Sequence, residues 1–337
     1  MYRTPQSITF CTVVIGSLVL PHLSAAAEPD PRRGLELILT KAYVEPLFDQ
    51  ETFDEVWRSW PEPLRSRAAN ANAEERRKMA FDRYGLTARP DDDSGKPLQF
   101  VVDKRGMWSA NCFTCHGGKL AGETVLGLPN SHFAAQTLTE DIVATAKRLN
   151  KPLPKPNYAG DPIPVHGSNG VTNAVTTTFL LLSQRDADLH RLQEPPRPKD
   201  LTHYDTDPPP WWRVKQRQRL YADGFAKKDH RALMVLLLDT PHGAKHFRDS
   251  EDDFRDILAR MEKLKPPKYP FPVDEQVAER GRRVFNRSCA DFHGTYGDDA
   301  QYPELIVPID EVETERARLY GASERHVAVY EKAWVTY

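Results

Sequence analysis

The sequence predicts a mainly α-helical protein whose helices are separated by long irregular loops. Apolar residues recur at helical spacing in several stretches, most clearly over residues 250–264, where Phe254, Ile257 and Met261 share one face. The chain of 337 residues also contains 28 prolines. Because proline interrupts both helices and central strands, this many prolines favours short helices joined by extended loops.

The expected elements follow from this periodicity in chain order. We expect helices over residues 34–84 (broken at Pro61 and Pro63), 138–149, 172–182, 211–225, 230–238 and 250–264. Residues 98–102 predict a short strand, and Asp274 is placed to cap a further helix. Residues 172–182 are rich in β-branched side chains, but among so many helical segments they favour a buried helix.

The most informative motif is Cys112-Phe113-Thr114-Cys115-His116. Two thiols at positions i and i+3 can reach the two vinyl groups on one edge of a porphyrin and form thioethers. The histidine that follows is then carried under the ring, where its neutral imidazole can bind the iron. The spacing therefore predicts covalently bound haem c, with Cys112 and Cys115 as attachment sites and His116 as a ligand of the iron.

Two other interpretations of paired cysteines explain less of the motif. A structural zinc site normally needs a second Cys or His pair at similar spacing, and the sequence has no second C-x-x-C. A thioredoxin-like dithiol does not need the adjacent histidine. Haem attachment is the interpretation that uses all three side chains.

Residues 1–27 predict a cleaved signal peptide. Arg3 forms a short positive region, residues 8–20 form an apolar region, and residues 24–27 offer a small-residue cleavage site. An uncleaved membrane anchor is the alternative, but Pro21 interrupts an apolar run shorter than the ~20 residues that a bilayer requires. We expect a soluble periplasmic protein without a membrane span after cleavage, because c-type haem is attached outside the bacterial cytoplasm.

Charge and cysteine content argue against a nucleic-acid-binding or membrane-binding protein and against a small secreted domain built on disulfides. The formal net charge is −2 at pH 7, which gives no reason to expect nucleic acid or an anionic membrane as a partner. Beyond residues 1–27 the chain keeps three cysteines, too few for a secreted domain built on disulfides. With 39 % hydrophobic residues, the fold would gain apolar core from a covalent haem.

A proline-rich stretch over residues 265–273 predicts a stiff linker between two parts of the chain. We expect an N-terminal haem c domain over residues 28–264. Residues 274–337 would then form a second cytochrome c-like domain that is incomplete.

The second domain contains a variant of the haem motif, Cys289-Ala290-Asp291-Phe292-His293. Phenylalanine occupies the position of the second thiol, while His293 is placed as an axial ligand of iron. Either this segment no longer binds haem, or a haem is held there by one thioether through Cys289. A haem with one thioether would be lost more readily than one with two.

The ordered set of motifs resembles the diheme cytochrome c peroxidase superfamily, in particular its methylamine-utilisation and rubber-oxygenase-like branch. The residues that carry the resemblance are 112–118, 208–212, 220–225, 266–274, 281–294 and 302–308. It implies two mainly helical cytochrome c-like domains that each hold a haem, one as reaction centre and the other passing electrons. The chain departs from the pattern at Phe292, over residues 312–316, and in a C-terminal part that looks truncated.

Candidate catalytic residues lie between the two motifs. Trp211 and Trp212 are consecutive tryptophans, a pattern most often found as core anchors but also able to carry an electron between metal centres. The resemblance implies that Phe225 forms an apolar wall over the distal face of the first haem. Candidates for the sixth iron ligand are His132, His166, His230 and Met234, with His326 as the one histidine after His293.

Three functional hypotheses follow. The first is a periplasmic c-type cytochrome that transfers electrons with a redox partner protein or a small electron donor. The second is a haem-dependent peroxidase or dioxygenase that acts at the first haem. The third is a relative that keeps its haem for structure alone.

Overall fold

The computed structural model describes residues 28–90, 92–152, 168–172, 174–194, 205–239, 242–297 and 300–336. This part of the chain is mainly helical with a few short strands, as predicted. The predicted signal peptide (residues 1–27) and the candidate ligand His166 lie outside the described residues. None of the described helices combines the length and the apolar composition needed to cross a bilayer.

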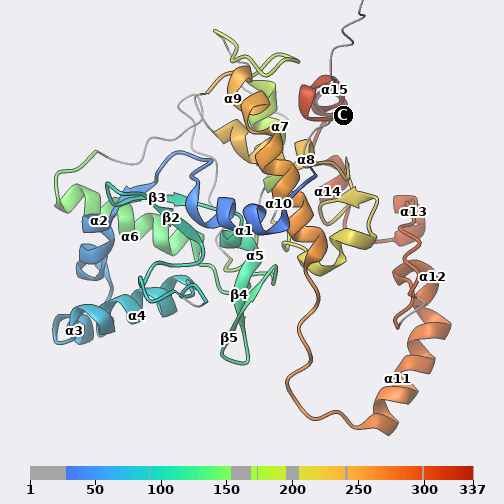
Figure 1. Cartoon of the computed structure of the whole chain (residues 1–337), viewed down its shortest axis with the longest axis horizontal. Coiled ribbons are helices and arrows are strands. Elements are labelled where there is room, and N and C mark those ends of the chain that lie inside the picture. The colour runs from blue at the N-terminus through green and yellow to red at the C-terminus, as the bar shows by residue number, and fades with distance from the viewer. Residues whose placement is uncertain are drawn as a thin grey trace, which may run out of the picture.

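One core lies in a lobe built around a small antiparallel sheet (Figure 1). Its elements are β1 (Phe48–Asp49), α2 (Gln50–Glu55), η1 (Val56–Ser59), α3 (Leu64–Ala69), α4 (Ala73–Tyr84), β2 (Phe100–Val102), β3 (Met107–Ala110) and α6 (Ala135–Arg148). Strand β3 is central, and Phe48 of β1 pairs with Trp108. Phe53 stacks on Trp108 with 4.3 Å between ring centroids, so aromatic rings fill the space between sheet and helices.

A second core surrounds α10 and carries the haem motif. Its elements are α1 (Pro31–Thr40), α5 (Phe113–His116), β4 (Gly117–Leu120), β5 (Glu123–Leu126), α7 (Ala174–Ser183), η2 (Trp211–Gln216), β6 (Arg219–Leu220), β7 (Ala226–Lys227), α8 (His230–Leu233), η3 (Met234–Asp239), α9 (Ala244–Asp249) and α10 (Glu251–Lys263). Helix α1 packs along α10 (Figure 1). Ile38, Phe254 and Ile257 are each about 1 % exposed there.

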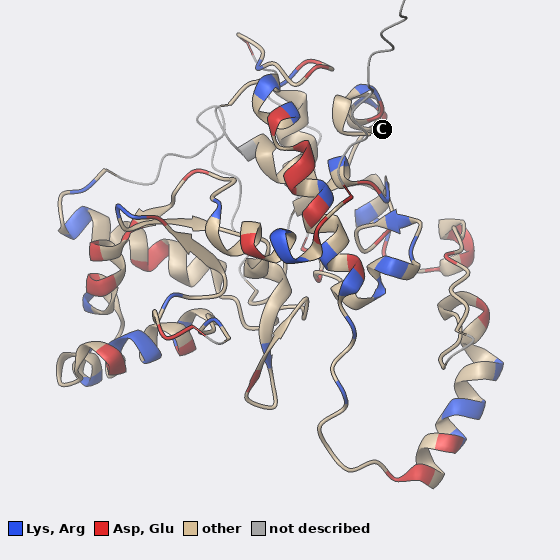
Figure 2. Cartoon of the chain, in the orientation of Figure 1, with Lys and Arg blue, Asp and Glu red and all other residues tan. Residues whose placement is uncertain are grey.

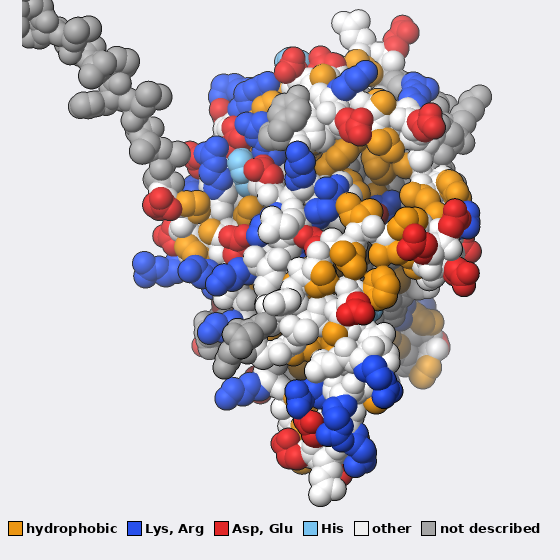
Figure 3. All heavy atoms as spheres, turned by 90° about the vertical axis from the view of Figure 1, so that its right-hand side faces the viewer, with side chains coloured by type: hydrophobic (Ala, Val, Ile, Leu, Met, Phe, Trp, Pro, Cys, Tyr) orange, Lys and Arg blue, Asp and Glu red, His pale blue; other side chains and the backbone are white. Residues whose placement is uncertain are grey.

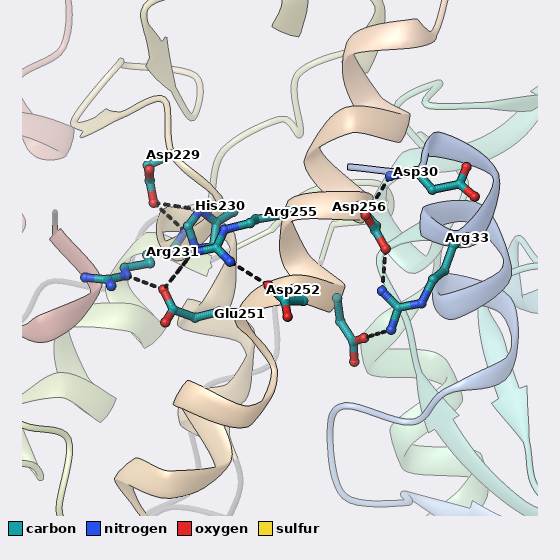
Figure 4. A network of polar contacts seen from close by, with 10 residues as sticks. Asp30, Arg33, Asp229, His230, Arg231, Glu251, Asp252, Arg255 and Asp256 are labelled. Carbon is teal, nitrogen blue, oxygen red and sulfur yellow. Dashed lines mark hydrogen bonds and ion pairs between the residues drawn. The ribbon is translucent and has the colours of Figure 1, made fainter. Parts of the chain in front are cut away.

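Ion pairs lock α1 to α10 beside this apolar contact (Figure 4). Arg33 donates to the carboxylates of both Asp253 and Asp256. Lys41 also pairs with Asp253, and the Tyr43 hydroxyl donates to it over 3.0 Å. The Asp253 side chain is 6 % exposed, so its charge depends on these donors for solvation.

The C-terminal residues divide between an extended arm and the body (Figure 1). The elements here are α11 (Glu275–Ser288), α12 (Ala290–His293), α13 (Ile309–Val312), α14 (Ala317–Tyr320), α15 (Glu324–Lys332) and η4 (Trp334–Thr336). Helix α11 lies out on the proline-rich linker and has no buried residue, whereas α15 packs on α7 and Val335 is buried in the core around α10. The segment predicted as a second domain, residues 274–337, is thus split between two places.

Several predicted elements are confirmed. Residues 172–182 contain all of α7 but its last residue, residues 250–264 contain α10, and residues 98–102 contain β2. Asp274 caps α11 by accepting from the backbone N–H groups of Gln276 and Val277.

The helix predicted over residues 211–225 is wrong beyond its first turns. Only η2 is helical, and residues 219–227 form the β6–β7 hairpin. Tyr221 and Gly224 both have φ of +68°, which no helix allows. The apolar spacing of this stretch resembles a helix because the core around α10 takes up Trp211, Val214 and Leu220 from a short 3-10 helix and a hairpin.

We predict that Asp253→Ala lowers the free energy of unfolding by about 3 kcal/mol, because three donors lose their shared buried acceptor. Asp252→Ala is the matched control: Asp252 is 80 % exposed and pairs with Arg255, so its loss should cost below about 0.5 kcal/mol. Urea denaturation at pH 7 measures both.

The same experiment has a pH dependence with a definite sign. Burial alone would raise the pKa of Asp253, but hydrogen bonds from Lys41 and Tyr43 and the nearby positive charges hold it below the usual 3.8. The unfolded chain therefore takes up this proton first, and the contribution of Asp253 to stability declines as pH falls below about 4. Equal urea midpoints for the two variants at pH 7 would contradict the prediction.

Candidate functional site

The haem motif forms a single helical turn. Cys112 precedes α5, and the backbone N–H of His116 donates to the Cys112 carbonyl over 3.1 Å. Phe113 points into the core and is 1 % exposed. This turn brings the two thiols and the imidazole of His116 onto one short element, as the spacing predicts.

Three buried amide side chains hold this turn in place. Asn111 accepts from the N–H of Phe113 over 2.8 Å, and Gln99 donates to the Gly117 carbonyl over 2.8 Å. Asn130 donates to the Thr114 carbonyl, and its N–H donates to the Cys115 carbonyl over 2.9 Å. Gln99 and Asn130 are at most 2 % exposed, so their loss would leave buried carbonyl groups without donors.

Gly127 connects the motif to η2. Its N–H donates to the His116 carbonyl over 2.7 Å, and its carbonyl accepts from the N–H of Trp211 over 3.0 Å. Its φ is +81°, and a Cβ at this position would lie 2.9 Å from both Leu264 and Trp211. Only glycine tolerates both the positive φ and the lack of space for a Cβ atom.

The His116 imidazole packs on Trp211, with 5.0 Å between ring centroids. Burial lowers the pKa of His116 to about 4, against a weaker opposite effect of the Pro209 carbonyl. The ring is therefore neutral at pH 7, as a metal ligand must be. Its Nδ1 atom is buried and has no hydrogen-bond partner of good geometry among the described residues.

Both motif thiols are free and protonated at neutral pH. Cys112 and Cys115 are partly buried, and Cys112 packs against the core around α10. Burial raises the pKa of Cys112 to about 12 and that of Cys115 to about 11, where a hydrogen bond with Thr172 acts in the opposite direction. Both shifts lower the fraction of thiolate, the nucleophilic form, in the folded chain.

The arrangement fits a haem better than a zinc ion. Within the described ranges, no group of three or more His, Cys, Asp or Glu side chains converges on a common point. Tetrahedral zinc would require such convergence. A haem instead needs two thiols along its edge and a neutral imidazole, which Cys112, Cys115 and His116 supply.

An aromatic cluster lies beside the motif, and Phe225 belongs to it. Phe225 contacts Tyr221 at 4.5 Å and Tyr330 at 5.2 Å between ring centroids, and Phe179 at 6.0 Å. Tyr221, Phe225 and Cys112 pack against the same core around α10. Burial is the main cause that raises the pKa of Tyr221, followed by Tyr330, Asp223 and Cys112. Phe179 and Tyr330 carry no signal in the sequence, because they reach this cluster from distant helices.

The predicted sixth ligands separate into different environments. His132 is exposed at the surface, and Met234 is 0 % exposed in the core. His230 is engaged by Glu251 at 3.1 Å and Asp229 at 3.3 Å (Figure 4). His326 is 2 % exposed, bonded through Nδ1 to Ser323, and 6.3 Å from the Phe179 ring.

The second motif opens onto a pocket of about 480 Å³, a volume typical of cofactor sites. The pocket is lined by Arg213, Gln216, Phe285, Cys289, His293, Thr295, Tyr296, Ala300, Gln301 and Tyr302. Cys289 and His293 thus face the same cavity, as the variant motif predicts. Phe292 does not line it and is 57 % exposed.

The two motifs are joined through η2. Trp211 at its start packs on His116, and Arg213 and Gln216 further along it line the pocket of the second motif. Trp211 is 3 % exposed, which confirms a core position, while Trp212 is partly buried. Spacing along the chain did not reveal that Arg213 belongs to the second site.

Glu304 fastens the C-terminal arm to the body. Its carboxylate pairs with Arg217 at 3.3 Å and accepts from the N–H groups of Gln218 and Arg219. Glu304 has φ of +46°, an unfavourable conformation for a residue with a side chain. These contacts bring the pocket residues of the arm against η2.

We predict that Gly127→Ala is more destabilising than Gly122→Ala. Both glycines have positive φ, but a Cβ at Gly122 would meet nothing within 4 Å. Gly122→Ala should cost about 1 kcal/mol for backbone strain alone, and Gly127→Ala about 2 kcal/mol more from the clash with Trp211 and Leu264. Urea denaturation followed by circular dichroism measures the difference, and equal losses would mean that the connection to η2 is not tight.

No protein-family model matches the chain, and a comparison with curated proteins finds no match either.

Proposed function

We propose that this chain is an exported c-type cytochrome of the diheme peroxidase-like type, which binds haem c through Cys112, Cys115 and His116 and transfers electrons. The observation that carries the proposal is the neutral His116 imidazole, held beside two free thiols on one rigid turn. When bound, the haem supplies an iron that alternates between two oxidation states.

The chain's own residues have separable roles in this proposal. Each thiol would add across a vinyl double bond, forming a carbon–sulfur bond while its hydrogen goes to the other vinyl carbon. Because burial raises the pKa of both thiols, we expect attachment before the chain folds, when thiolate forms more readily. His116 would bind the iron through one ring nitrogen, and Trp211 would fix the plane of that ring.

A second haem is proposed in the pocket of Cys289 and His293. The cavity has the size of a cofactor site, and both side chains line it. Attachment there would use one thioether, since Phe292 cannot react with a vinyl group. Electrons would pass between the two sites along η2, with Trp211 and Trp212 between the motifs, and then to a redox partner protein or a small electron donor.

A haem-dependent peroxidase or dioxygenase at the first haem is the alternative. The observation that favours it is the aromatic cluster of Phe225, Tyr221 and Phe179, in which Phe225 and Tyr221 pack against the same core as Cys112. Apolar surroundings with few hydrogen-bond donors would suit oxygen binding better than peroxide cleavage. Steady-state oxygen uptake in the presence of an apolar alkene would separate an enzyme from an electron carrier.

Replacing both Cys112 and Cys115 by alanine should abolish covalent haem at the first site. His116→Ala should keep the thioethers but change the spectrum, because the iron loses a ligand. Mass spectrometry of denatured protein and of its haem peptide decides the first result, and visible spectroscopy decides the second. Full covalent haem in the double variant would refute the proposal.

Phe292→Cys tests the second site. If a haem is held at Cys289, its unreacted vinyl group should shift the reduced α-band to longer wavelength than that of the first haem. The substitution should restore the second thioether, move that band back and raise covalent haem towards two per chain. One haem per chain in both proteins would leave a cytochrome with a single haem.

A further inference from the structure

The pocket of the second motif is shared between two parts of the chain. Cys289 and His293 come from the C-terminal arm, whereas Arg213 and Gln216 come from η2 in the body. Basic residues gather around η2, β6 and β7 (Figure 2). Among the lining residues, Arg213 alone carries a permanent charge, so it decides which polar group a ligand can present there.

Arg213 is held at the pocket by an aromatic ring and an amide side chain. Its guanidinium lies 5.1 Å from the centre of the Tyr296 ring and donates to Gln216 over 3.3 Å. No carboxylate of the described residues forms an ion pair with it, although Arg217 on the same stretch pairs with Glu304. A half-buried guanidinium that lines a cavity and lacks a carboxylate partner favours an anionic ligand.

We propose that Arg213 binds a carboxylate of the cofactor in this pocket, which is a propionate of the second haem. This inference rests on the proposed second haem site. The vinyl and propionate groups of haem lie at different edges of the ring. The pocket offers the Cys289 thiol from the arm and the Arg213 guanidinium from η2. The Phe285 and Tyr296 rings, 5.3 Å apart, supply apolar surface between them.

The ligand would therefore join the arm to the body. Glu304 holds the arm so that Arg213 and Cys289 face one cavity. Helix α11 contributes no buried residue, and Val277, Val284 and Phe292 of the arm are each more than half exposed. Hydrophobic side chains gather on the face of the molecule that Figure 3 shows. An arm with so little apolar burial of its own gains most from a ligand that bridges it to η2.

The test compares haemin with haemin dimethyl ester, which lacks free carboxylates. Both are titrated into the full exported chain carrying Cys289→Ala, so that the first site is loaded and the second is free of covalent haem. Absorbance changes in the Soret region report binding. The same titrations are done after adding Arg213→Gln, Arg213→Lys, or the exposed control Lys215→Gln on the same 3-10 helix.

With Arg213 present, haemin should bind about 10-fold to 100-fold more tightly than the diester, from a charge-assisted hydrogen bond. Arg213→Gln should remove this preference, Arg213→Lys should keep part of it, and Lys215→Gln should keep all of it. Two results would overturn the role of Arg213 but leave the second haem site standing. One is a preference for haemin that survives Arg213→Gln, and the other is equal affinity for haemin and its diester with Arg213 present. If neither porphyrin binds, the second haem site is overturned as well.

Discussion

The contact between the His116 imidazole and the Trp211 indole is the interaction on which the rest of the site depends. The ring centroids are 5.0 Å apart, and Gly127 joins the two residues through backbone hydrogen bonds on both sides. This contact orients the side chain proposed to bind iron and at the same time positions η2. Because Arg213 lies on η2, the first motif also sets one wall of the second pocket.

The surroundings of the first motif combine rigidity with low polarity. Gln99, Asn111 and Asn130 satisfy backbone groups of the turn, so it can be buried without unpaired carbonyls. The same burial lowers the pKa of His116 and raises those of the two thiols. Burial thus keeps the His116 imidazole neutral, as its proposed role as an iron ligand requires.

One part of the C-terminal residues is buried in the core around α10, and another part lies outside it on an arm. Residues of α15 and η4 enter the core around α10, where Val335 is 1 % exposed. Helix α11 and the second motif instead lie on an arm that Glu304 fastens to the β6 region. The pocket of Cys289 and His293 therefore exists only where arm and body meet.

The sequence alone determined the helical class, the helices α7 and α10, the cap at Asp274 and the residues of both motifs, because periodicity, capping and spacing are local properties. It could not place Arg213 in the second pocket, Phe179 and Tyr330 beside Phe225, or a hairpin over residues 219–227. These features depend on which segments of the chain pack against one another in the folded protein. Only tertiary packing decides that, since it balances burial and hydrogen bonding over the whole chain.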